Sequence, residues 1–272
     1  KIWIGTPNGM NIFHPVTGTF QRIVLSNEPS NSKKNEINEI FCDFSGALWI
    51  GTNDGLYQFD EQDHVFNQVE LIPTVALVRF EGWERIINAI HQDKDNAIWI
   101  GTDYSLFSIK GGIQEWYGFN KGENKSPSNI YINNIVSVSH SGLNELWLAT
   151  HWGLNKLDLN SGIFTHFFSD PNNDQSVSHN DINHICVEDN RLLWLGGSDG
   201  VDILKLRNNE FHHHITRFGN FGYSAVTFHE DSDGIIWVGS PNAGLLKYDH
   251  NLNLMERCAL NLPNGDTARV YS

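Results

Sequence analysis

The sequence predicts an all-β protein, a β-propeller of four-stranded antiparallel blades, and three observations lead to that prediction. A tryptophan within a short apolar run recurs along the 272-residue chain, at Trp3, Trp49, Trp99, Trp147, Trp194 and Trp237. These tryptophans are separated by 46, 50, 48, 47 and 43 residues, close to the roughly 40 to 50 residues of one propeller blade. Strand-forming residues dominate between them, and no convincing amphipathic helix interrupts the pattern. We therefore expect one propeller domain over residues 1–272, with a repeat unit centred on each tryptophan.

Each repeat has the order of elements that a blade requires. An alternating apolar run comes first and ends, in four units, in an acidic residue six positions before the tryptophan: Asp43, Asp93, Glu188 and Asp231. A polar turn leads to a run such as "LWIGT", whose unbroken apolar character predicts a strand buried on both faces. Its glycine permits a close backbone approach that a larger side chain would block. A third strand such as "GLNKLD" and an aromatic-rich outer strand complete the unit.

The two ends of the chain leave the size of the ring open. The sequence opens at a second strand, and its last residues, "GDTARVYS", weakly resemble the start of another first strand. The six repeat units therefore either close a six-blade ring or form part of a seven-blade ring, and we prefer the second alternative. Because "KIWIGTPNGM" has neither an initiator methionine nor a signal-peptide pattern, we expect a piece excised from a longer chain.

Composition narrows the classes of function. A formal net charge of −14 argues against a broad nucleic-acid-binding surface, which needs clustered Lys and Arg. No apolar run is long enough to span a membrane. Cys42, Cys186 and Cys258 have no CxxC spacing, so they predict neither a zinc site nor a disulfide framework, and two of them are expected to be buried small hydrophobes.

The repeat resembles a known family. The pattern "NxIxxIxxDxxGxLWIGTxxGLxxFD", together with the connection "FFSDPNNDQSVSHNDI" at Phe167 to Ile182, is similar to the two-component regulator propeller repeat. The resemblance implies the periplasmic sensor region of a hybrid histidine kinase, an oligosaccharide ligand and signalling through a homodimer of the intact sensor. It implies contact with the membrane only through segments outside this sequence, and no nucleic-acid partner for this domain.

Blade topology predicts where a ligand can bind. The turn between strands two and three lies at the same end of a blade as the connection to the next blade, so we call this end the candidate binding face. Its turn residues are Asn53–Asp54, Asp103–Tyr104, His151–Trp152 and Ser198–Asp199, and its connections contain Trp83, Asn129–Tyr131 and Asn180–Asp181.

A sugar site needs an exposed aromatic platform flanked by amides, carboxylates, His or Arg. The candidate ligand-binding residues on this face are Trp83, Arg85, Tyr104, His151, Trp152, Asn180 and Asp181. The alternative for Trp152 is that it covers the end of its blade. The six repeated tryptophans are expected to pack, as is Trp116 on an outer strand, and none of them is expected to contact ligand.

Other chemistries have weaker support in the sequence. Consecutive strand residues point to opposite faces, so His212–His214 predicts an outer-strand surface feature and no metal site. The turn Glu230–Gly234 lacks the calcium-loop ligand pattern, and we expect no cofactor and no catalytic residue. Two alternatives to a sensor remain. One is a propeller lyase or glycosidase using turn carboxylates such as Asp54, Asp103, Asp181 and Asp199, and the other is a protein-interaction scaffold.

Overall fold

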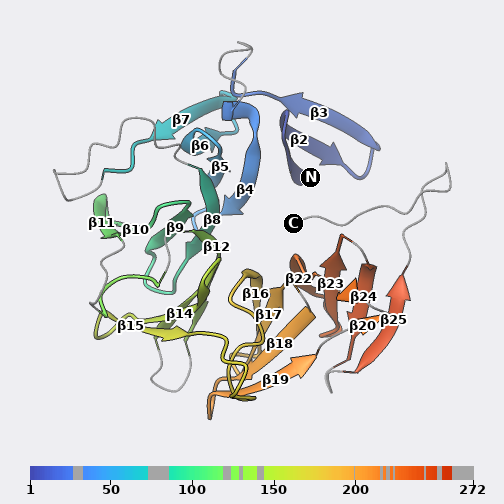
Figure 1. Cartoon of the computed structure of the whole chain (residues 1–272). Helices are drawn as coiled ribbons and strands as arrows, with labels where there is room; N and C mark the ends of the chain where they lie inside the picture. The colour runs from blue at the N-terminus through green and yellow to red at the C-terminus, as the bar shows by residue number, and fades with distance from the viewer. Residues whose placement is uncertain are drawn as a thin grey trace. The chain divides into compact units, whose positions relative to one another are not determined.

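The computed structural model describes residues 1–26, 33–72, 86–118, 124–128, 131–139, 144–198, 200–214, 217–218, 221–222, 224–241, 243–249 and 253–258. Apart from one 3₁₀ turn at residues 33–35, the regular structure in these ranges is β, and it forms the six blades of a β-propeller (Figure 1). The chain divides into two compact units, Lys1–Ile135 and Val136–Ser272, and each unit is described by itself. None of the described residues belongs to a helix with the length and apolarity needed to cross a membrane.

Among the residues that the structure describes, five blades have four antiparallel strands in sequence order, and blade 1 has three. Blade 1 consists of β1 (Ile2–Thr6), β2 (Gly9–His14) and β3 (Thr19–Ile23). Blade 2 consists of β4 (Ile37–Cys42), β5 (Leu48–Thr52), β6 (Gly55–Asp60) and β7 (Val65–Val69). Blade 3 consists of β8 (Ile87–Gln92), β9 (Ile98–Thr102), β10 (Ser105–Lys110) and β11 (Ile113–Gly118).

The later blades follow the same order. Blade 4 consists of β12 (Ile132–Val138), β13 (Glu145–Thr150), β14 (Gly153–Asp158) and β15 (Ile163–Phe167). Blade 5 consists of β16 (Ile182–Glu188), β17 (Leu192–Gly197), β18 (Gly200–Lys205) and β19 (Glu210–His214). Blade 6 consists of β22 (Thr227–Glu230), β23 (Ile236–Ser240), β24 (Gly244–Tyr248) and β25 (Leu254–Cys258). A short hairpin, β20 (Arg217–Phe218) and β21 (Phe221–Gly222), lies between blades 5 and 6 and was not predicted.

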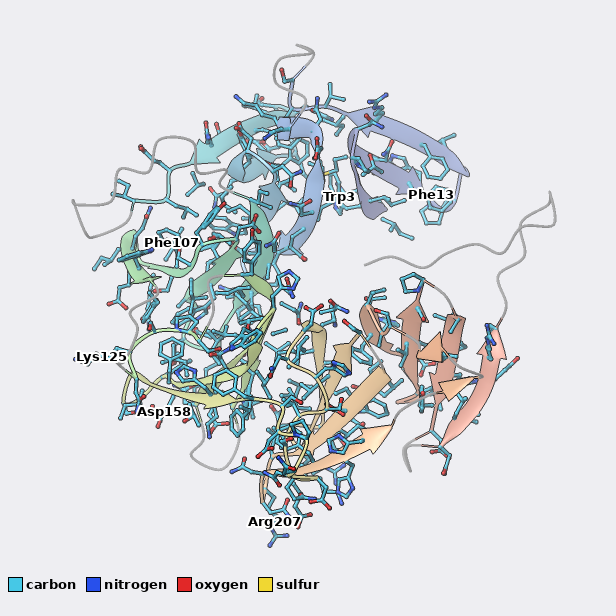
Figure 2. All side chains as sticks on the ribbon, in the orientation of Figure 1. Trp3, Phe13, Phe107, Lys125, Asp158 and Arg207 are labelled. Atoms are coloured by element: carbon cyan, nitrogen blue, oxygen red, sulfur yellow. The ribbon has the colours of Figure 1, made fainter. Side chains whose placement is uncertain are left out.

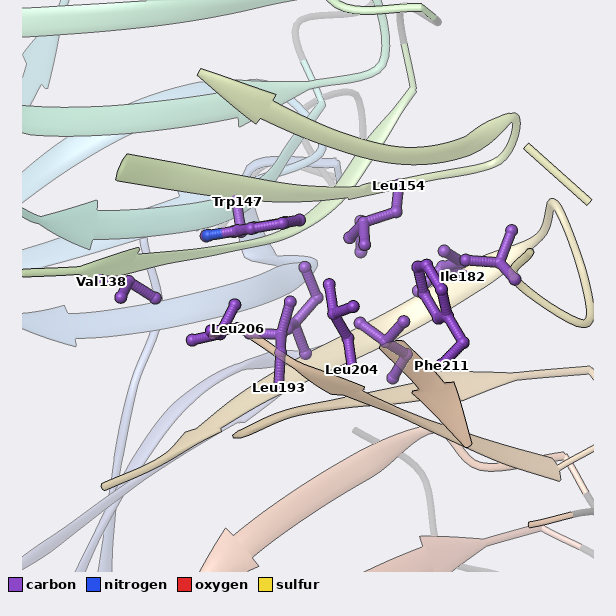
Figure 3. Close-up of a cluster of buried hydrophobic side chains, with 12 residues drawn as sticks. Val138, Trp147, Leu154, Ile182, Leu193, Leu204, Leu206 and Phe211 are labelled. Carbon is purple, nitrogen blue, oxygen red and sulfur yellow. The ribbon is translucent and has the colours of Figure 1, made fainter. Parts of the chain in front are cut away.

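In blades 2 to 6 the second strands form the buried centre, as the unbroken apolar runs predict, whereas β1 of blade 1 is largely exposed. Every residue of β5, β9 and β13 is buried. Figure 3 shows how the cluster between blades 4 and 5 is filled: Trp147 and Leu154 of blade 4 face Leu193, Leu204 and Phe211 of blade 5. Because each blade has apolar faces on both sides, this burial joins neighbouring blades as well as neighbouring strands.

The acidic residue before each turn is a hydrogen-bond acceptor for the repeated tryptophan. The indole Nε1 of Trp49, Trp99, Trp194 and Trp237 donates to the carboxylate six residues earlier, at 2.9, 2.8, 2.7 and 2.8 Å. In blade 4, Trp147 Nε1 donates instead to Glu145 Oε2, two residues earlier, at 3.1 Å. The carboxylate therefore satisfies an N–H that burial would otherwise leave without an acceptor.

The glycine of the second strand accommodates an isoleucine of the next blade. A Cβ added at Gly51 would lie 2.8 Å from Ile87 Cγ2, and one at Gly101 would lie 2.6 Å from Ile132 Cγ2. Both distances are shorter than ordinary van der Waals contact. The expected role of this glycine in close packing is therefore confirmed, and the close neighbour is a side chain of the following first strand.

We expect Gly101→Val to lower the free energy of unfolding by roughly 1 to 3 kcal/mol, because the added methyl groups overlap with Ile132. Urea denaturation followed by circular dichroism measures this change. Adding Ile132→Ala to Gly101→Val should restore part of the loss, since the pair are in contact and their effects should not add. Strict additivity in this double-mutant cycle would contradict the overlap.

The asparagine of the first strand has a role that periodicity does not predict. The pairing of the first and second strands shifts register around Asn38, Asn88 and Asn183, so each of these residues occupies a β-bulge. Asn38 Nδ2 donates to Asn53 Oδ1 at 2.8 Å and to the Ile87 carbonyl of the next blade at 3.2 Å. The bulge thus directs an amide towards the candidate binding face and towards the neighbouring blade.

The structure corrects two expectations about side chains and confirms a third. Cys42 ends β4 and is exposed, so it is not a buried hydrophobe. His212 and His213 are half-buried, because the outer strand is covered by the connection from blade 4, and they are not a plain surface feature. Trp116 packs against the core cluster of blades 2 and 3, as predicted. In blade 1, Trp3 is half-buried on β1 and packs edge-on against Phe59 of blade 2, with ring centroids 5.6 Å apart (Figure 2).

Candidate functional site

The turn that carries His151 and Trp152 has a backbone determined by the residues around it. Thr150 Oγ1 donates to the Gly153 carbonyl at 2.7 Å and accepts the Trp152 N–H at 3.1 Å. Gly153 has a φ of +96°, and a Cβ there would lie 2.5 Å from the Phe167 carbonyl oxygen. Threonine and glycine therefore shape the turn, and the two residues between them are free to vary in chemistry.

The same threonine hydrogen bonds recur in other blades. Thr52 Oγ1 accepts the Asp54 N–H at 3.0 Å, and Thr102 Oγ1 accepts the Tyr104 N–H at 3.0 Å. Each of these turns presents two variable residues at the same end of its blade. The repeat thus supplies the scaffold, and the variable pair supplies the chemistry.

Asn180 holds the blade 4–5 connection against this turn. Its backbone carbonyl accepts the Gly153 N–H at 2.6 Å, and its Oδ1 accepts the Ser169 N–H at 2.8 Å. Asn35 occupies the equivalent position before β4, and its Oδ1 accepts the N–H groups of Leu25 and Ser26 at 2.8 and 3.1 Å. Because two repeats use this asparagine in the same way, Asn180 is an architectural residue whose side-chain oxygen is already bonded.

Asp181 joins the variable turns of two consecutive blades. Its Oδ1 lies 2.6 Å from His151 Nδ1, and its Oδ2 accepts a hydrogen bond from Ser198 Oγ at 3.1 Å. His151 and Asp181 retain 48% and 43% exposure of their side chains, so solvent and ligand can reach the pair. The serine and the histidine both bond to the carboxylate, so their arrangement is not that of a Ser–His–Asp triad, in which the histidine bonds to the serine.

Trp152 is 56% exposed, whereas the repeated tryptophan of its own blade, Trp147, has no exposed surface. A large aromatic side chain left half in solvent beside polar groups is typical of a recognition surface. The alternative, that Trp152 covers the end of its blade, would use the part of the ring that is not in solvent.

A second aromatic pair lies at the junction of blades 3 and 4. Tyr104, in the variable turn of blade 3, and Tyr131, just before β12, have ring centroids 6.2 Å apart. The negative charge of nearby Asp103 raises the pKa of Tyr131, so its hydroxyl stays protonated at neutral pH. Tyr131 is 36% exposed and stands at the position that Asp181 occupies one blade later.

The predicted site residues therefore fall into three groups. His151, Trp152, Asn180 and Asp181 are adjacent within the second compact unit. Tyr104 lies in the first unit, beside Tyr131. The predictions for Trp83, Arg85, Asn129, Asp199 and the "GDTARVYS" strand fall outside the described residues.

The sequence did not predict that Ser198 contacts Asp181 or that Tyr131 contacts Tyr104. Both were assigned to the face by topology, but neither was chosen as a candidate ligand-binding residue. Their signal was present in the repeat, because each occupies a variable position that in another blade carries a candidate residue. Whether a turn contacts the connection that follows it depends on the distance between neighbouring blades. The sequence of a single repeat does not contain that distance.

Two titratable groups on first strands, Glu39 and His184, have strongly shifted pKa values. Burial raises the pKa of Glu39 to about 8, and burial lowers the pKa of His184 to about 4. His184 packs against the ring of Phe228, with centroids 5.8 Å apart, and its buried Nδ1 has no hydrogen-bond partner among the described residues. Within the described ranges, no three His, Cys, Asp or Glu side chains are grouped so that they could hold a metal ion.

One family model matches part of the repeat. Residues 83–104 match the family model described as "Two component regulator propeller". No curated protein matches the chain closely enough to count as a relative.

Among solved structures, the extracellular domain named as a hybrid two component system of B. thetaiotaomicron has a TM-score of 0.66 and 22% identity. The match covers 80% of this chain and 29% of that one, so the chain spans less than a third of its length. Catalytically inactive virginiamycin B lyase from Staphylococcus aureus, with quinupristin, has a TM-score of 0.68 and 14% identity over 92% of this chain and 77% of that one.

The GH74 enzyme of Niastella koreensis has a TM-score of 0.62 and 14% identity, over 90% of this chain and 40% of that one. Identities this low establish the propeller fold and nothing finer. Residues 83–104 are the part of the chain that matches the two-component regulator propeller model, and the repeat in the other blades is similar to that part.

Proposed function

We propose that this chain is the ligand-binding part of an extracytoplasmic sensor in a two-component signalling protein, and that its ligand is an oligosaccharide. The observation that carries the proposal is the exposed ring of Trp152 beside the His151–Asp181 pair. Binding sites for small molecules combine aromatic surface with a few placed polar groups. A sugar has apolar C–H faces for the ring and hydroxyls for the carboxylate, imidazole and Ser198.

The match of residues 83–104 to the two-component regulator propeller model supports the sensor interpretation over an enzyme. The likeness to an extracellular domain of a two-component system is consistent with an extracytoplasmic, periplasmic location for the chain. The intact protein would transmit the signal through a homodimer and through membrane segments outside this chain. Since a ligand shifts a conformational equilibrium only by its differential affinity, binding must discriminate between two arrangements of that intact sensor.

Calorimetric titration of the chain with a panel of defined oligosaccharides, followed by product analysis, tests this function. Binding without turnover supports a sensor. Product formation would show an enzyme, a class to which two of the structural neighbours belong. Absence of any binding across the panel would contradict an oligosaccharide ligand and favour a protein-interaction surface.

Trp152→Ala should weaken binding of the oligosaccharide by about tenfold or more, because central aromatic contacts dominate interface energies. Its thermal stability should remain close to that of the parent, since the side chain is largely in solvent. Phe44→Ala is the matched control. Phe44 is 70% exposed and lies in the turn after a first strand, at the opposite end of its blade, so its loss should not change affinity. Equal effects of the two substitutions would contradict the assigned face.

A further inference from the structure

We propose that His213, in its doubly protonated form, is a positioning residue that holds the blade 4–5 connection in place and makes the candidate binding face pH-dependent. The inference deepens the proposed function, because this connection ends in Asn180 and Asp181. Protonation of a residue on the outer strand of blade 5 would thereby regulate that site.

His213 contacts two groups that can only accept hydrogen bonds. Its Nδ1 lies 2.7 Å from Asp202 Oδ1, and its Nε2 lies 2.8 Å from the Asp174 carbonyl oxygen. A neutral imidazole has one N–H, so it can satisfy one of these acceptors and not both. Only the imidazolium can donate to both acceptors at once.

Asp202 connects the histidine to the same connection at a second point. It lies on β18, beside β19, and is 6% exposed. Its Oδ2 accepts both the backbone N–H and the hydroxyl of Ser178, each at 2.8 Å. His213 and Asp202 together hold the connection at Asp174 and at Ser178.

Hydrogen bonds within the connection carry this anchoring to the site. Ser169 Oγ donates to the Ser178 carbonyl at 3.1 Å, and Ser169 N–H donates to Asn180 Oδ1 at 2.8 Å. Asn180 in turn accepts the Gly153 N–H at 2.6 Å, in the turn that carries Trp152. The path from the proton-binding group to the recognition face is thus a continuous series of hydrogen bonds.

The two charged groups that face His213, Asp202 and Asp174, both raise its pKa. Burial alone lowers the pKa of His213, but hydrogen bonds to Asp202 and Asp174 and their negative charges outweigh burial and raise it above 6.5. A raised pKa in the folded state means that the stabilisation is complete below the unfolded pKa. It is lost as the pH rises through the raised value, so the connection should loosen above pH 6.5.

Blade 4 contains an internal control for this arrangement. At the position equivalent to Asp202 it has Asn155, and His166 Nδ1 lies 2.7 Å from Asn155 Oδ1. A neutral imidazole can make that single bond by donating to the amide oxygen. Burial lowers the pKa of His166, so this second pair should not respond to protons near neutral pH.

Amide hydrogen exchange of the ligand-free chain at pH 6 and pH 8, corrected for intrinsic rates, tests the proposal. We expect protection of residues 172–178 and of the Gly153 amide to fall severalfold at the higher pH. In His213→Gln, which cannot titrate, protection should be low at both values, and in His166→Gln the pH dependence should persist. A histidine NMR titration of the parent should give His213 a pKa above 6.5.

Three results would overturn the positioning role. They are pH-independent protection in the parent, an unchanged profile in His213→Gln, or a Gly153 amide that stays protected while residues 172–178 open. None of these measurements uses a sugar. Failure of the proposed function would therefore leave the exchange result standing, and failure of the exchange test would leave sugar binding to be judged separately.

Discussion

Replacing Trp194 with alanine is expected to lower the free energy of unfolding by roughly 3 to 5 kcal/mol, the largest stability effect of any change considered for this chain. The Trp194 side chain has no exposed surface. It packs against Phe228 and Tyr248 of blade 6, with ring centroids 6.3 and 5.7 Å away. Because both partners belong to the next blade, truncation opens a cavity between two blades. Urea denaturation followed by far-ultraviolet circular dichroism measures the change.

Two further variants separate the contributions. Trp194→Phe keeps an aromatic ring but removes the indole N–H that donates to Glu188 Oε2 at 2.7 Å, so it should cost less than the alanine variant. Trp152→Ala removes the same side chain type from an exposed turn and should change stability by no more than about 0.5 kcal/mol. If the alanine variants at 194 and 152 were equally stable, the distinction between packing and recognition tryptophans would be wrong.

Replacing Asp93 with alanine should cost about 3 kcal/mol or more, because three donors lose their acceptor together. Asp93 is 3% exposed. Its Oδ1 accepts the N–H groups of Asp95 and Ala97, each at 2.9 Å, and its Oδ2 accepts the Trp99 indole at 2.8 Å. One carboxylate therefore determines both the turn and the orientation of the repeated tryptophan. The loss is measured as a decrease in the free energy of unfolding by urea.

Asp93→Asn and Asp231→Ala are informative comparisons. Asparagine keeps one oxygen acceptor but presents an NH₂ group to a donor, so its stability should fall between those of the parent and Asp93→Ala. Asp231 makes the equivalent bonds to Ile235 and Trp237 in a solvent-exposed turn, where water can replace the lost acceptor, so its loss should cost less. An alanine variant at Asp93 as stable as the parent would contradict the structural role of the carboxylate.

The blade architecture was predictable because each repeat encodes its own hydrogen bonding and burial locally. The tryptophan spacing, the buried "LWIGT" strands and the close-approach glycine were all deduced from sequence and are confirmed. The acidic residue was noted by its position, but its bond to the indole was not foreseen. The bulge at Asn38 was also missed, although Ile37 and Ile40 pack in one cluster three residues apart, a spacing that departs from strict alternation.

The candidate site was predictable only as a face. Topology correctly assigned the variable turns and the connections to one end of each blade, and the His151–Trp152 turn does contact the connection at Asn180 and Asp181. The ligand-binding role of Asn180 remains a prediction, and its Oδ1 also supports the connection, as that of Asn35 does. The predictions for Trp83 and Arg85 remain predictions, because both residues lie outside the described ranges.

By itself, the sequence determined the class of fold and the division between repeated and variable residues. Periodic burial and turn chemistry depend on residues close together in sequence. Because the chain contains six repeats, the same local pattern can be recognised six times. Only the tertiary structure decided which variable residues meet. Asp181 reaches both His151 and Ser198, and His213 reaches Asp174, across 30, 17 and 39 residues of sequence. Such contacts depend on how one blade packs against the next. That packing arises from all the apolar residues of the repeat and not from the two residues that make the contact.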